Sequence, residues 1–520
     1  MVKKFTSTIA GGAIFITLIG LIGRGLGVVR ESIFANYFGL SQKYDLYLVA
    51  IVFPITINSI FIYFAQNFYI PKYHQLKIES EEKARNFTNS VFWFFAGFGI
   101  LTSVILIIFS NVIINAYVVT KDINQINIAI SIFRIFILSI PFGFSSSILS
   151  AILQANYEFK FPPFSQLFLN IFIILTVVLF SNGIGIFSIA WGNLIGVIFQ
   201  FAYLYLKTTK LITLEINYIK ISYVKKIFDI SFISILLIEV LGQIYLLSDR
   251  YFLHSVESGG IAALNYSYNI YLLPISIISM ALATAMLPKL SSLISEGAKV
   301  ELTRNMNLFI EVTLFLFTPI AIIFFFDGDI IIRILFQRGK FLLNDTIITS
   351  NTLKLYTLSL IFFAAYSGIN RLLYSTKMVR QLLIVVILAA MSKIFFNFIL
   401  VEHFKQDGLA LSTSISFLIL FTGSYTILIV KKIIFTDYIF IKNFVLNIFN
   451  AFISYLIILI VFQPILENGL FLRLIMISSF ITMYIINANV TKQNSLQLFI
   501  GTAKAIPIFN FIQKGENRIG

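Results

Sequence analysis

Apolar runs long enough to cross a membrane recur from one end of this 520-residue chain to the other. A helix of roughly 20 apolar residues spans the ~30 Å hydrocarbon layer of a bilayer. Inside that layer each backbone polar group must be paired within its own segment, so such runs form helices. The sequence therefore predicts an all-α polytopic membrane protein with about fourteen transmembrane helices. They are expected near residues 5–29, 45–70, 87–116, 128–153, 164–182, 185–206, 228–248, 261–288, 305–326, 347–373, 381–401, 407–430, 441–463 and 470–489.

Composition agrees with a membrane protein and argues against several soluble classes. Hydrophobic residues make up 58% of the chain and charged residues 12%, about half the share found in soluble domains. Cysteine is absent, which excludes disulfide bonds and thiol chemistry. The three histidines, His74, His254 and His403, are scattered over loop-like positions, so neither a zinc site nor another cofactor is expected. The first apolar run is too long for the core of a cleavable signal peptide.

The net charge of +15 is explained by membrane topology rather than by nucleic acid binding. With the N-terminus in the cytoplasm, most Lys and Arg residues fall in cytoplasmic segments, as the positive-inside rule requires. An even number of spans then places both termini in the cytoplasm. The expected location is the bacterial inner membrane.

An internal repeat divides the chain. In three pairs of residues, the two members are separated by the same number of residues. In each copy a span ends in Arg, a short Gly-containing loop follows, and the next span contains Pro. The pairs are Arg30 and Arg250, Gly39 and Gly259, and Pro54 and Pro274. A parallel repeat of six spans is a transporter architecture with the binding site between the halves. The predicted domains are an N-terminal six-helix lobe (1–226), a C-terminal six-helix lobe (227–432), two additional transmembrane helices (433–490) and a cytoplasmic tail (491–520).

The first span ends in "LIGRGLGVVRESIFANYFG" (21–39), which places arginines among glycines. Gly20, Arg24, Gly27 and Glu31 fall on one helical face. A charge in hydrocarbon costs at least ~2.5 kcal/mol, so Arg24 either reaches the membrane surface or lines a water-filled cavity between the halves. The glycine face favours the cavity. Because guanidinium pairs with carboxylate and phosphate, the expected cargo is anionic.

Other charges near the spans leave two interpretations open. Arg30 and Arg250 belong either to the binding site or to a structural pair at the outer surface, with Glu31 and Asp249 beside them to neutralise them. Arg134 interrupts an apolar run and needs either a cavity or an interhelical partner.

The second half of the chain has its own polar positions inside apolar runs. Glu239 is either a hydrogen-bonded residue at a helix contact or a site for a coupling ion or proton. Lys393 lies one turn from Asn397 in the eleventh span and could pair with Glu239.

Several motifs resemble the MurJ (MviN) lipid II flippases, members of the multidrug/oligosaccharidyl-lipid/polysaccharide exporter superfamily. "GRGLGVVRESIFANYFGLSQKYDLYLVAIVFPI" resembles the family's first-span signature, and "ILFQRGKF" (334–341) resembles its loop after the ninth span. Weaker matches are "ILQANYEFKFP" (152–162), "SDRYFLHSVESGGIAALNYSYNIYLLP" (248–274) and "AMLPKLS" (285–291). The matches are spread over roughly residues 20–420.

The resemblance implies a V-shaped bundle of two six-helix lobes with two additional C-terminal helices. It also implies alternating-access transport of an undecaprenyl-pyrophosphate-linked glycan, whose pyrophosphate is held by cavity arginines. Arg24, Arg30 and Asp45 match family positions. Asn58, Ser59 and Asn269 stand where many members have arginine, so the arginine cluster is only partly present.

The predicted site therefore has three parts. The substrate-binding residues are Arg24, Arg30, Arg134, Asn58, Ser59 and Asn269. The supporting or gating residues are Glu31, Asp45, Asp249 and Arg250. The candidates for ion coupling are Glu239 and Asn397. Some family members have a sodium site; Asp249 and Asn397 would correspond, but Lys393 opposes a cation there, so sodium or the membrane potential remains open as the driving force.

The leading function is a monomeric flippase for lipid II, with membrane lipids as its other partners and no nucleic acid. An O-antigen or capsule repeat-unit flippase is the alternative, favoured by the missing arginines. A cation-coupled multidrug antiporter of the same fold would need a carboxylate in the first span, where this chain has arginine. A membrane-embedded enzyme is disfavoured, because Asp327 and Asp329 are its best acidic pair and they stand at a span boundary.

Overall fold

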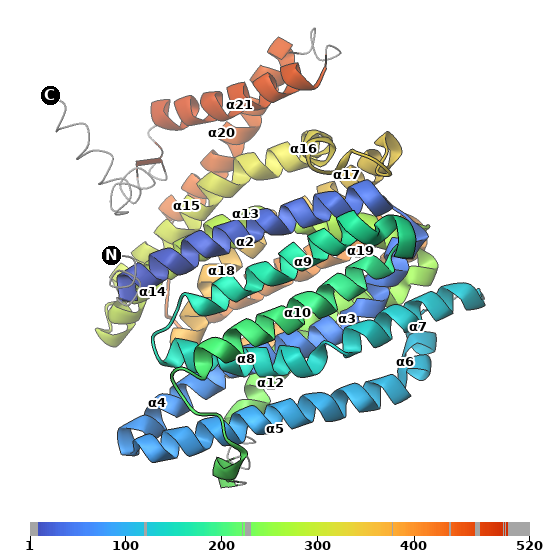
Figure 1. Cartoon of the computed structure of the whole chain (residues 1–520). Coiled ribbons are helices and arrows are strands. Elements are labelled where there is room, and N and C mark those ends of the chain that lie inside the picture. Colours follow the sequence, from blue (N-terminus) through green and yellow to red (C-terminus); the bar gives the residue numbers. More distant parts are fainter. Residues whose placement is uncertain are drawn as a thin grey trace, which may run out of the picture. The chain divides into compact units, whose positions relative to one another are not determined.

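The computed structural model describes residues 9–118, 122–220, 222–223, 230–376, 378–435, 438–462, 469–491, 493 and 496–497. Within these residues the regular structure is helical throughout (Figure 1). Ten of the described helices are long and apolar enough to cross a membrane, or eleven if the bent pair Leu343–Thr357 and Leu360–Ser375 forms one span. The all-α polytopic membrane fold is thereby confirmed, and the count of fourteen spans stays a prediction.

The chain forms two compact units. Unit 1 comprises residues 1–263 and 335–346, and unit 2 comprises residues 264–334 and 347–520. These units follow from contacts in the folded chain, whereas the domain boundaries predicted above follow from the sequence repeat. The repeat boundaries stay a prediction.

Unit 1 is a bundle of long helices, most of them joined by short turns, with a longer connection between Thr208 and Ile230. Its elements are α2 (Ile9–Phe38), α3 (Gln42–Phe64), η1 (Ala65–Tyr69), α4 (Ile70–Glu79), α5 (Glu81–Ile108), α6 (Ser110–Tyr117), α7 (Ile123–Ile137), α8 (Ile140–Ala155), α9 (Phe161–Ile184), α10 (Phe187–Thr208), η2 (Ile216–Tyr218), α12 (Ile230–Tyr251) and η3 (Phe252–Ser255). Helix α2 packs on α9, α9 on α10, and α3 on α7 and α12 (Figure 1).

Glycines end helices where the chain reverses. Gly39, between α2 and α3, and Gly185, between α9 and α10, have φ values of 55° and 60°. Gly259, the repeat partner of Gly39, has a φ of 87°. This left-handed region carries little steric cost for glycine alone. The two repeated glycines thus share a backbone conformation with positive φ.

Unit 2 begins within α13 (Gly260–Pro274), which starts in unit 1. The elements that follow are η4 (Ile275–Ser279), α14 (Met280–Ser295), α15 (Lys299–Phe326), α16 (Gly328–Phe336), α17 (Leu343–Thr357), α18 (Leu360–Ser375), α19 (Val379–Val430), α20 (Tyr438–Phe462) and α21 (Leu470–Val490). Helix α19 is broken at Lys405, where φ is 51° and ψ is −131°. The eleventh and twelfth predicted spans lie on the two sides of this break.

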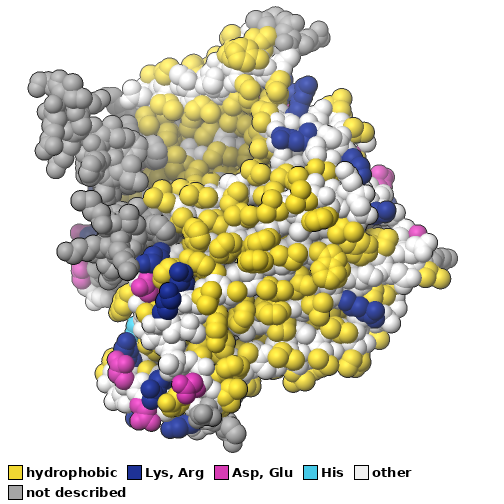
Figure 2. Space-filling view, viewed as in Figure 1, with side chains coloured by type: hydrophobic (Ala, Val, Ile, Leu, Met, Phe, Trp, Pro, Cys, Tyr) yellow, Lys and Arg dark blue, Asp and Glu magenta, His cyan; other side chains and the backbone are white. Residues whose placement is uncertain are grey.

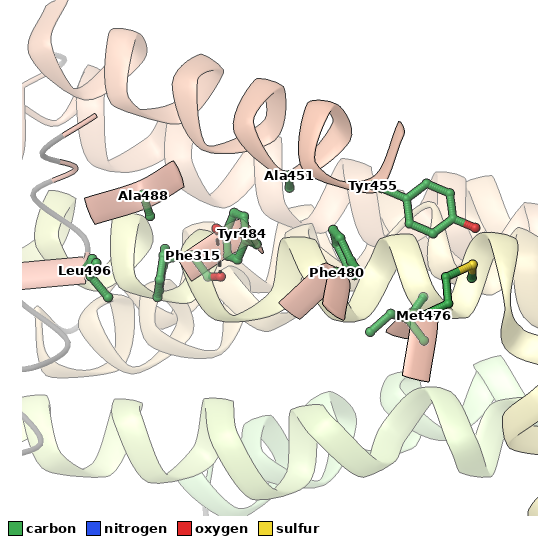
Figure 3. Close-up of a cluster of buried hydrophobic side chains, with 9 residues drawn as sticks. Phe315, Ala451, Tyr455, Met476, Phe480, Tyr484, Ala488 and Leu496 are labelled. Atoms are coloured by element: carbon green, nitrogen blue, oxygen red, sulfur yellow. Dashed lines mark hydrogen bonds between the residues drawn. The ribbon is translucent and has the colours of Figure 1, made fainter. Parts of the chain in front are cut away.

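The additional helices α20 and α21 are attached to α15 by an apolar core (Figure 3). Phe315 of α15, Tyr455 of α20 and Phe480 and Tyr484 of α21 are buried together in it. Phe315 and Tyr484 stack with ring centroids 5.1 Å apart, and the Tyr484 hydroxyl donates to the Phe315 carbonyl (3.1 Å). These large rings bury much apolar surface, which holds the two helices on unit 2.

A polar cluster lies at one end of this core. Arg473 of α21 binds both oxygens of Asp329 (2.6 and 2.9 Å) and one oxygen of Asp327 (3.0 Å). The Tyr455 hydroxyl donates to the other oxygen of Asp327 (2.8 Å). The best candidates for a catalytic acidic pair are therefore engaged in holding α21, as expected at a span boundary.

The outer surface is suited to lipid. Figure 2 shows hydrophobic side chains covering the visible helices, with charged side chains gathered towards the helix ends. On α9, for example, Leu175, Leu179 and Phe180 are exposed. In a membrane protein such a face contacts acyl chains.

Candidate functional site

The last turns of α2 carry a hydrogen-bonded group that we call the α2 cluster: Arg30, Glu31, Tyr44 and Asn170. Arg30 donates from Nη1 to Asn170 Oδ1 of α9 (3.0 Å) and from Nη2 to Glu31 Oε1 (2.7 Å). The Tyr44 hydroxyl of α3 donates to Glu31 Oε2 (3.3 Å). Glu31 is buried, at 6% exposure, so its carboxylate balances the Arg30 charge in a shielded place. The cluster joins α2 to α3 and α9, and the predicted neutralisation of Arg30 by Glu31 is confirmed.

Arg24 lies earlier on α2, where the helix has a packed side and an open side. A Cβ added at Gly23 would contact Leu167 of α9 at 3.8 Å. At Gly20 and Gly27 an added Cβ would have no heavy atom within 4 Å in the described structure. Arg24 shares their face and is partly exposed. The guanidinium therefore stands on a glycine-lined surface with space beside it, a geometry that admits a ligand group close to the helix.

Asp45, in the first turn of α3, caps the start of α13. Its carboxylate accepts the backbone N–H of Gly259 (2.5 Å) and that of Ala262 (2.7 Å). The first N–H groups of a helix have no partner within the helix, and a carboxylate there satisfies them and complements the helix dipole. Asp45 is 1% exposed. The acidic residue at the start of the second span thus fastens α3 to α13 within unit 1.

Arg250 and Asp249 lie at the end of α12 in buried positions. Arg250 donates from Nη1 to the Ile261 carbonyl (3.3 Å), and its positive charge acts on the Asp45 carboxylate. Arg250 therefore belongs to the same corner as Asp45, while Arg30 belongs to the α2 cluster. These hydrogen bonds favour a structural role for both Arg30 and Arg250 at their span ends.

Asn58 and Ser59 lie on α3 in half-buried positions. Gly143 of α8 allows Asn58 to approach, because a Cβ at Gly143 would lie 2.4 Å from Asn58 Oδ1. Asn269, on α13 in unit 2, is also half-buried. These amide and hydroxyl groups are neutral hydrogen-bonding groups at positions where the family resemblance implied charge.

Arg134 on α7 is exposed and bonds to α6. Its Nε donates to Ser110 Oγ (2.9 Å) and its Nη2 to Asn111 Oδ1 (3.2 Å). Of the two interpretations, the interhelical partner is the one the structure contains. The part of Arg134 in substrate binding stays a prediction.

Of the candidates for ion coupling, Glu239 is on α12 of unit 1 and Asn397 is on α19 of unit 2. The side chain of Glu239 lies outside the described residues. Lys393 and Asn397 are fully buried on the first half of α19. Lys393 Nζ donates to Thr413 Oγ1 (2.6 Å), and Asn397 Oδ1 accepts from the Ser412 hydroxyl, both on the second half of α19. An ammonium thus occupies the polar core of this hairpin.

The described residues were also considered as metal ligands. Among those residues, no group of three or more His, Cys, Asp or Glu side chains is placed to hold an ion.

Several hydrogen-bond partners of α2 were not predicted from the sequence. Asn170 and Tyr44 complete the α2 cluster, and residues 335–346, which join α16 to α17, contact the end of α2. An asparagine within the apolar run "FSQLFLNIFII" was a usable signal for Asn170, because a polar side chain in a span needs a partner. The loop contact has no local signal.

The chain is similar to known proteins in family, in sequence and in fold. A family model described as "Lipid II flippase MurJ" matches residues 34–482. A probable lipid II flippase MurJ from Buchnera aphidicola subsp. Schizaphis graminum is 31% identical over 476 residues, covering 88% of this chain and 91% of its own length. A second, from Buchnera aphidicola subsp. Acyrthosiphon pisum, is 28% identical, with 78% and 80% covered.

Solved structures agree. A structure of lipid II flippase MurJ in an inward closed conformation matches with a TM-score of 0.79 and 26% identity, covering 92% of this chain and 98% of that one. An inward-facing multidrug resistance transporter of the MATE family matches with a TM-score of 0.65 and 12% identity, covering 79% and 94%. The second likeness concerns the fold alone.

Proposed function

Because the chain belongs to the lipid II flippase MurJ family, we propose that it moves lipid II, the undecaprenyl-pyrophosphate-linked precursor of peptidoglycan, across the bacterial inner membrane. The headgroup passes from the cytoplasmic to the periplasmic leaflet by alternating access. The protein is a transporter and carries out no chemical conversion of its cargo. Its termini lie in the cytoplasm, and it works as a monomer.

The observation that carries the proposal in this chain is the open arginine face of α2. Arg24 precedes the segment matched by the family model, so its part is argued from its surroundings. It lies on a glycine-lined surface with space beside Gly20 and Gly27. A guanidinium keeps its charge and forms paired hydrogen bonds with phosphate oxygens, as pyrophosphate binding requires.

Arg30 has a different part in this proposal. Its charge is balanced by Glu31 and its Nη1 is held by Asn170. We assign Arg30 mainly to fixing α2 against its neighbours, with Arg24 as the principal contact to the pyrophosphate. Asn58, Ser59 and Asn269 supply neutral hydrogen bonds to the polar headgroup, and Arg134 stays a weaker candidate because it bonds to α6.

The position of Lys393 supports a proposal for the driving force. Its buried ammonium lies one turn from Asn397, where it repels a second cation. We therefore propose that the chain works without a bound cofactor and that membrane potential, rather than sodium, drives transport.

The replaced arginines favour an O-antigen or capsule repeat-unit flippase as the second candidate. A cargo with fewer charges near the headgroup would need fewer guanidinium groups. The multidrug antiporter shares the fold, but Arg24 would repel a cationic drug.

Lipid transport in proteoliposomes tests the proposal. Arg24→Ala is expected to abolish movement of lipid II while the protein still inserts and purifies as the wild type does. Arg24→Lys should restore part of the activity, because it keeps the charge and loses the fork. Arg304→Ala, at an exposed arginine of α15, is the matched control and should keep full activity.

Two results would count against the assignment. Normal lipid II transport by Arg24→Ala would remove Arg24 from the site. Transport of an O-antigen or capsule lipid by the wild type, with none for lipid II, would select the second candidate.

A further inference from the structure

The fourth and tenth predicted spans are broken at equivalent serines. Ser139 lies between α7 and α8, and Ser359 lies between α17 and α18. They are separated by the same number of residues as the pairs of the internal repeat, and we call this separation the repeat distance. Gly185 and Lys405 are also one repeat distance apart and share a rare backbone conformation, with φ of 60° and 51° and ψ of −134° and −131°. The repeat therefore includes local structure as well as residue types.

Each serine makes the same two hydrogen bonds. The Ser139 N–H and hydroxyl both donate to the Phe136 carbonyl, at 3.0 and 2.6 Å. The Ser359 N–H and hydroxyl both donate to the Tyr356 carbonyl, at 3.1 and 2.9 Å. Both serines are buried. A break leaves helix carbonyls without their usual N–H partners, and hydrocarbon supplies none, so the serine hydroxyls take over part of that bonding.

The two breaks differ in shape. Helices α7 and α8 together form one candidate span, Ile123–Ala155. Helices α17 and α18 meet at an angle of 47°. The serine bonds lie within one turn and do not fix the direction of the helix that follows. The same bonding therefore accommodates different angles between the two helices.

Two further hydroxyl groups surround the second break. The Tyr271 hydroxyl of α13 lies 3.0 Å from Ser359 Oγ. The Ser414 hydroxyl of α19 donates to the Leu355 carbonyl (2.5 Å), and it also lies 3.2 Å from the Tyr356 carbonyl and 3.1 Å from Ser359 Oγ. We call Tyr271, Ser359 and Ser414 the hydroxyl cluster. Its three residues are buried and belong to unit 2.

The first break has no such cluster in the described structure. Ile51 and Leu194 stand one repeat distance before Tyr271 and Ser414, and both are buried apolar residues. The Ser139 hydroxyl accordingly bonds to a backbone carbonyl of its own turn. The hydroxyl cluster is thus a property of the bent copy of the span.

The hydroxyl cluster offers more than one hydrogen-bonding pattern. A hydroxyl group donates one hydrogen and can rotate to another acceptor. The Ser414 hydrogen has three acceptors within reach, and the Ser359 hydrogen has two. In a fixed bend the N–H and hydroxyl of Ser359 already satisfy the Tyr356 carbonyl. The additional donors are therefore suited to a bend that changes.

Flat ring contacts surround the hydroxyl cluster. The Tyr271 ring is nearly parallel to the rings of Phe363 and Phe417, at 18° and 7°. Phe363 and Phe417 stack with centroids 4.0 Å apart. Phe363 is one turn beyond Ser359, so this stack joins α18 to α13 and α19. Parallel ring faces keep their contact when they slide by a small distance, which interlocked branched side chains do not.

The bent span also connects the two units along the chain. Helix α17 begins at Leu343 in unit 1 and continues into unit 2, where α18 lies. Alternating access moves parts of a transporter relative to one another, so a connecting span benefits from a place where it can bend.

We propose that the break at Ser359 is a joint at which α17 and α18 change their angle during transport, while the break at Ser139 keeps its shape. The hydroxyl cluster exchanges hydrogen-bond acceptors as the angle changes, so that no backbone carbonyl loses its partner inside the membrane. Tyr271, Ser359 and Ser414 are then positioning residues that act through the direction of α18. The inference rests on the proposed transport function for its activity assay.

Spin-label distances test the change of angle, because the chain contains no cysteine of its own. The variant Asn351→Cys with Tyr374→Cys places one label on each side of the second break, at exposed positions. The variant Ser131→Cys with Gln154→Cys is the matched control, since each site lies one repeat distance earlier. In proteoliposomes we expect two distance populations for the first pair and one for the control. A single population of equal width in both pairs would overturn the proposal.

A matched serine pair tests the hydroxyl cluster. Ser359→Ala and Ser139→Ala remove the same local bond, to the carbonyl three residues earlier, but only Ser359→Ala removes the centre of the cluster. We expect Ser359→Ala to lower the maximal transport rate about tenfold, as the loss of one hydrogen bond in the moving step would, with a smaller change in the KM for lipid II. Ser139→Ala should keep the wild-type rate. Equal losses of rate in the two variants would refute the role of the cluster.

Tyr271→Phe provides a second test, because it keeps the ring and removes the hydroxyl. It should slow transport and reduce the labelled pair at residues 351 and 374 to one distance population. If this variant keeps both the full rate and two populations, the Tyr271 hydroxyl has no part in the joint. The test holds even if Ser359→Ala does not fold.

The outcomes separate this proposal from the proposed function. If the wild type moves no lipid II, the proposed cargo is wrong, and the joint is then judged by label distances without lipid II. Two populations at the second break and one at the first would support the joint. One population at the second break would refute it whatever the cargo.

Discussion

Asp45 should make one of the largest single contributions to the stability of unit 1. Its carboxylate accepts two backbone N–H groups at the start of α13, at 2.5 and 2.7 Å, and is almost fully buried. Asp45→Ala removes both acceptors and leaves the N–H groups of Gly259 and Ala262 buried. Water cannot readily replace the carboxylate there.

The magnitude follows from the bonds. A hydrogen bond to a charged group contributes about 1.5–3 kcal/mol, so the two together are worth about 3–6 kcal/mol. Asp45→Asn keeps one carbonyl acceptor and should lose about half of that. An exposed cap provides the comparison: Asp122 accepts the Asn124 N–H at the start of α7 (2.9 Å), and Asp122→Ala should cost about 1 kcal/mol.

Denaturant unfolding in one detergent, followed by circular dichroism, measures these differences. The expected order of stability is wild type, Asp122→Ala, Asp45→Asn and Asp45→Ala. If Asp45→Ala costs no more than Asp122→Ala, burial adds nothing to the cap, and the argument from buried hydrogen bonds is wrong.

Three further predictions concern other contacts. Glu31→Gln should destabilise the protein by about 1–2 kcal/mol by removing the Arg30 counter-charge, and adding Arg30→Gln should cost less than the sum of the single changes in a double-mutant cycle. Arg473→Met leaves the Asp327 and Asp329 carboxylates without their shared counter-charge, so it should lower the free energy of unfolding by about 3 kcal/mol. Limited proteolysis should then cleave α20 and α21 sooner than in the wild type. Unchanged cleavage would show that Arg473 does not hold α21 in place. Replacing sodium by choline at constant membrane potential should leave the lipid II transport rate unchanged, and a sodium-dependent rate would refute the proposal drawn from Lys393.

Much of the fold could be predicted because it depends on local sequence. Span length and hydropathy indicate helices directly, and glycine marks reversals such as those at Gly39 and Gly185. The pairing of Arg30 with Glu31 was also predictable, because the residues are adjacent. The Arg24 glycine face was visible from helical periodicity alone.

The distant hydrogen-bond partners of the polar residues were much harder to predict from the sequence. Arg134 bonds to Ser110 and Asn111, and Asp45 caps a helix more than two hundred residues away, which no local pattern indicates. Asp327 and Asp329 are the best acidic pair in the sequence, but both bind Arg473, a residue far along the chain. Such contacts arise from packing between distant segments.

The sequence by itself determined that this chain spans a membrane with many helices and places arginine on a glycine face of its first span. Length, hydropathy and residue spacing are enough for that, because the bilayer requires each span to satisfy its own backbone. Only the tertiary structure decided which distant helices the Arg30–Glu31 pair joins, which helix Asp45 caps, and that residues 335–346 bind the end of α2. Those choices depend on hydrogen bonds between segments far apart in sequence, and a polar residue does not encode its distant partner.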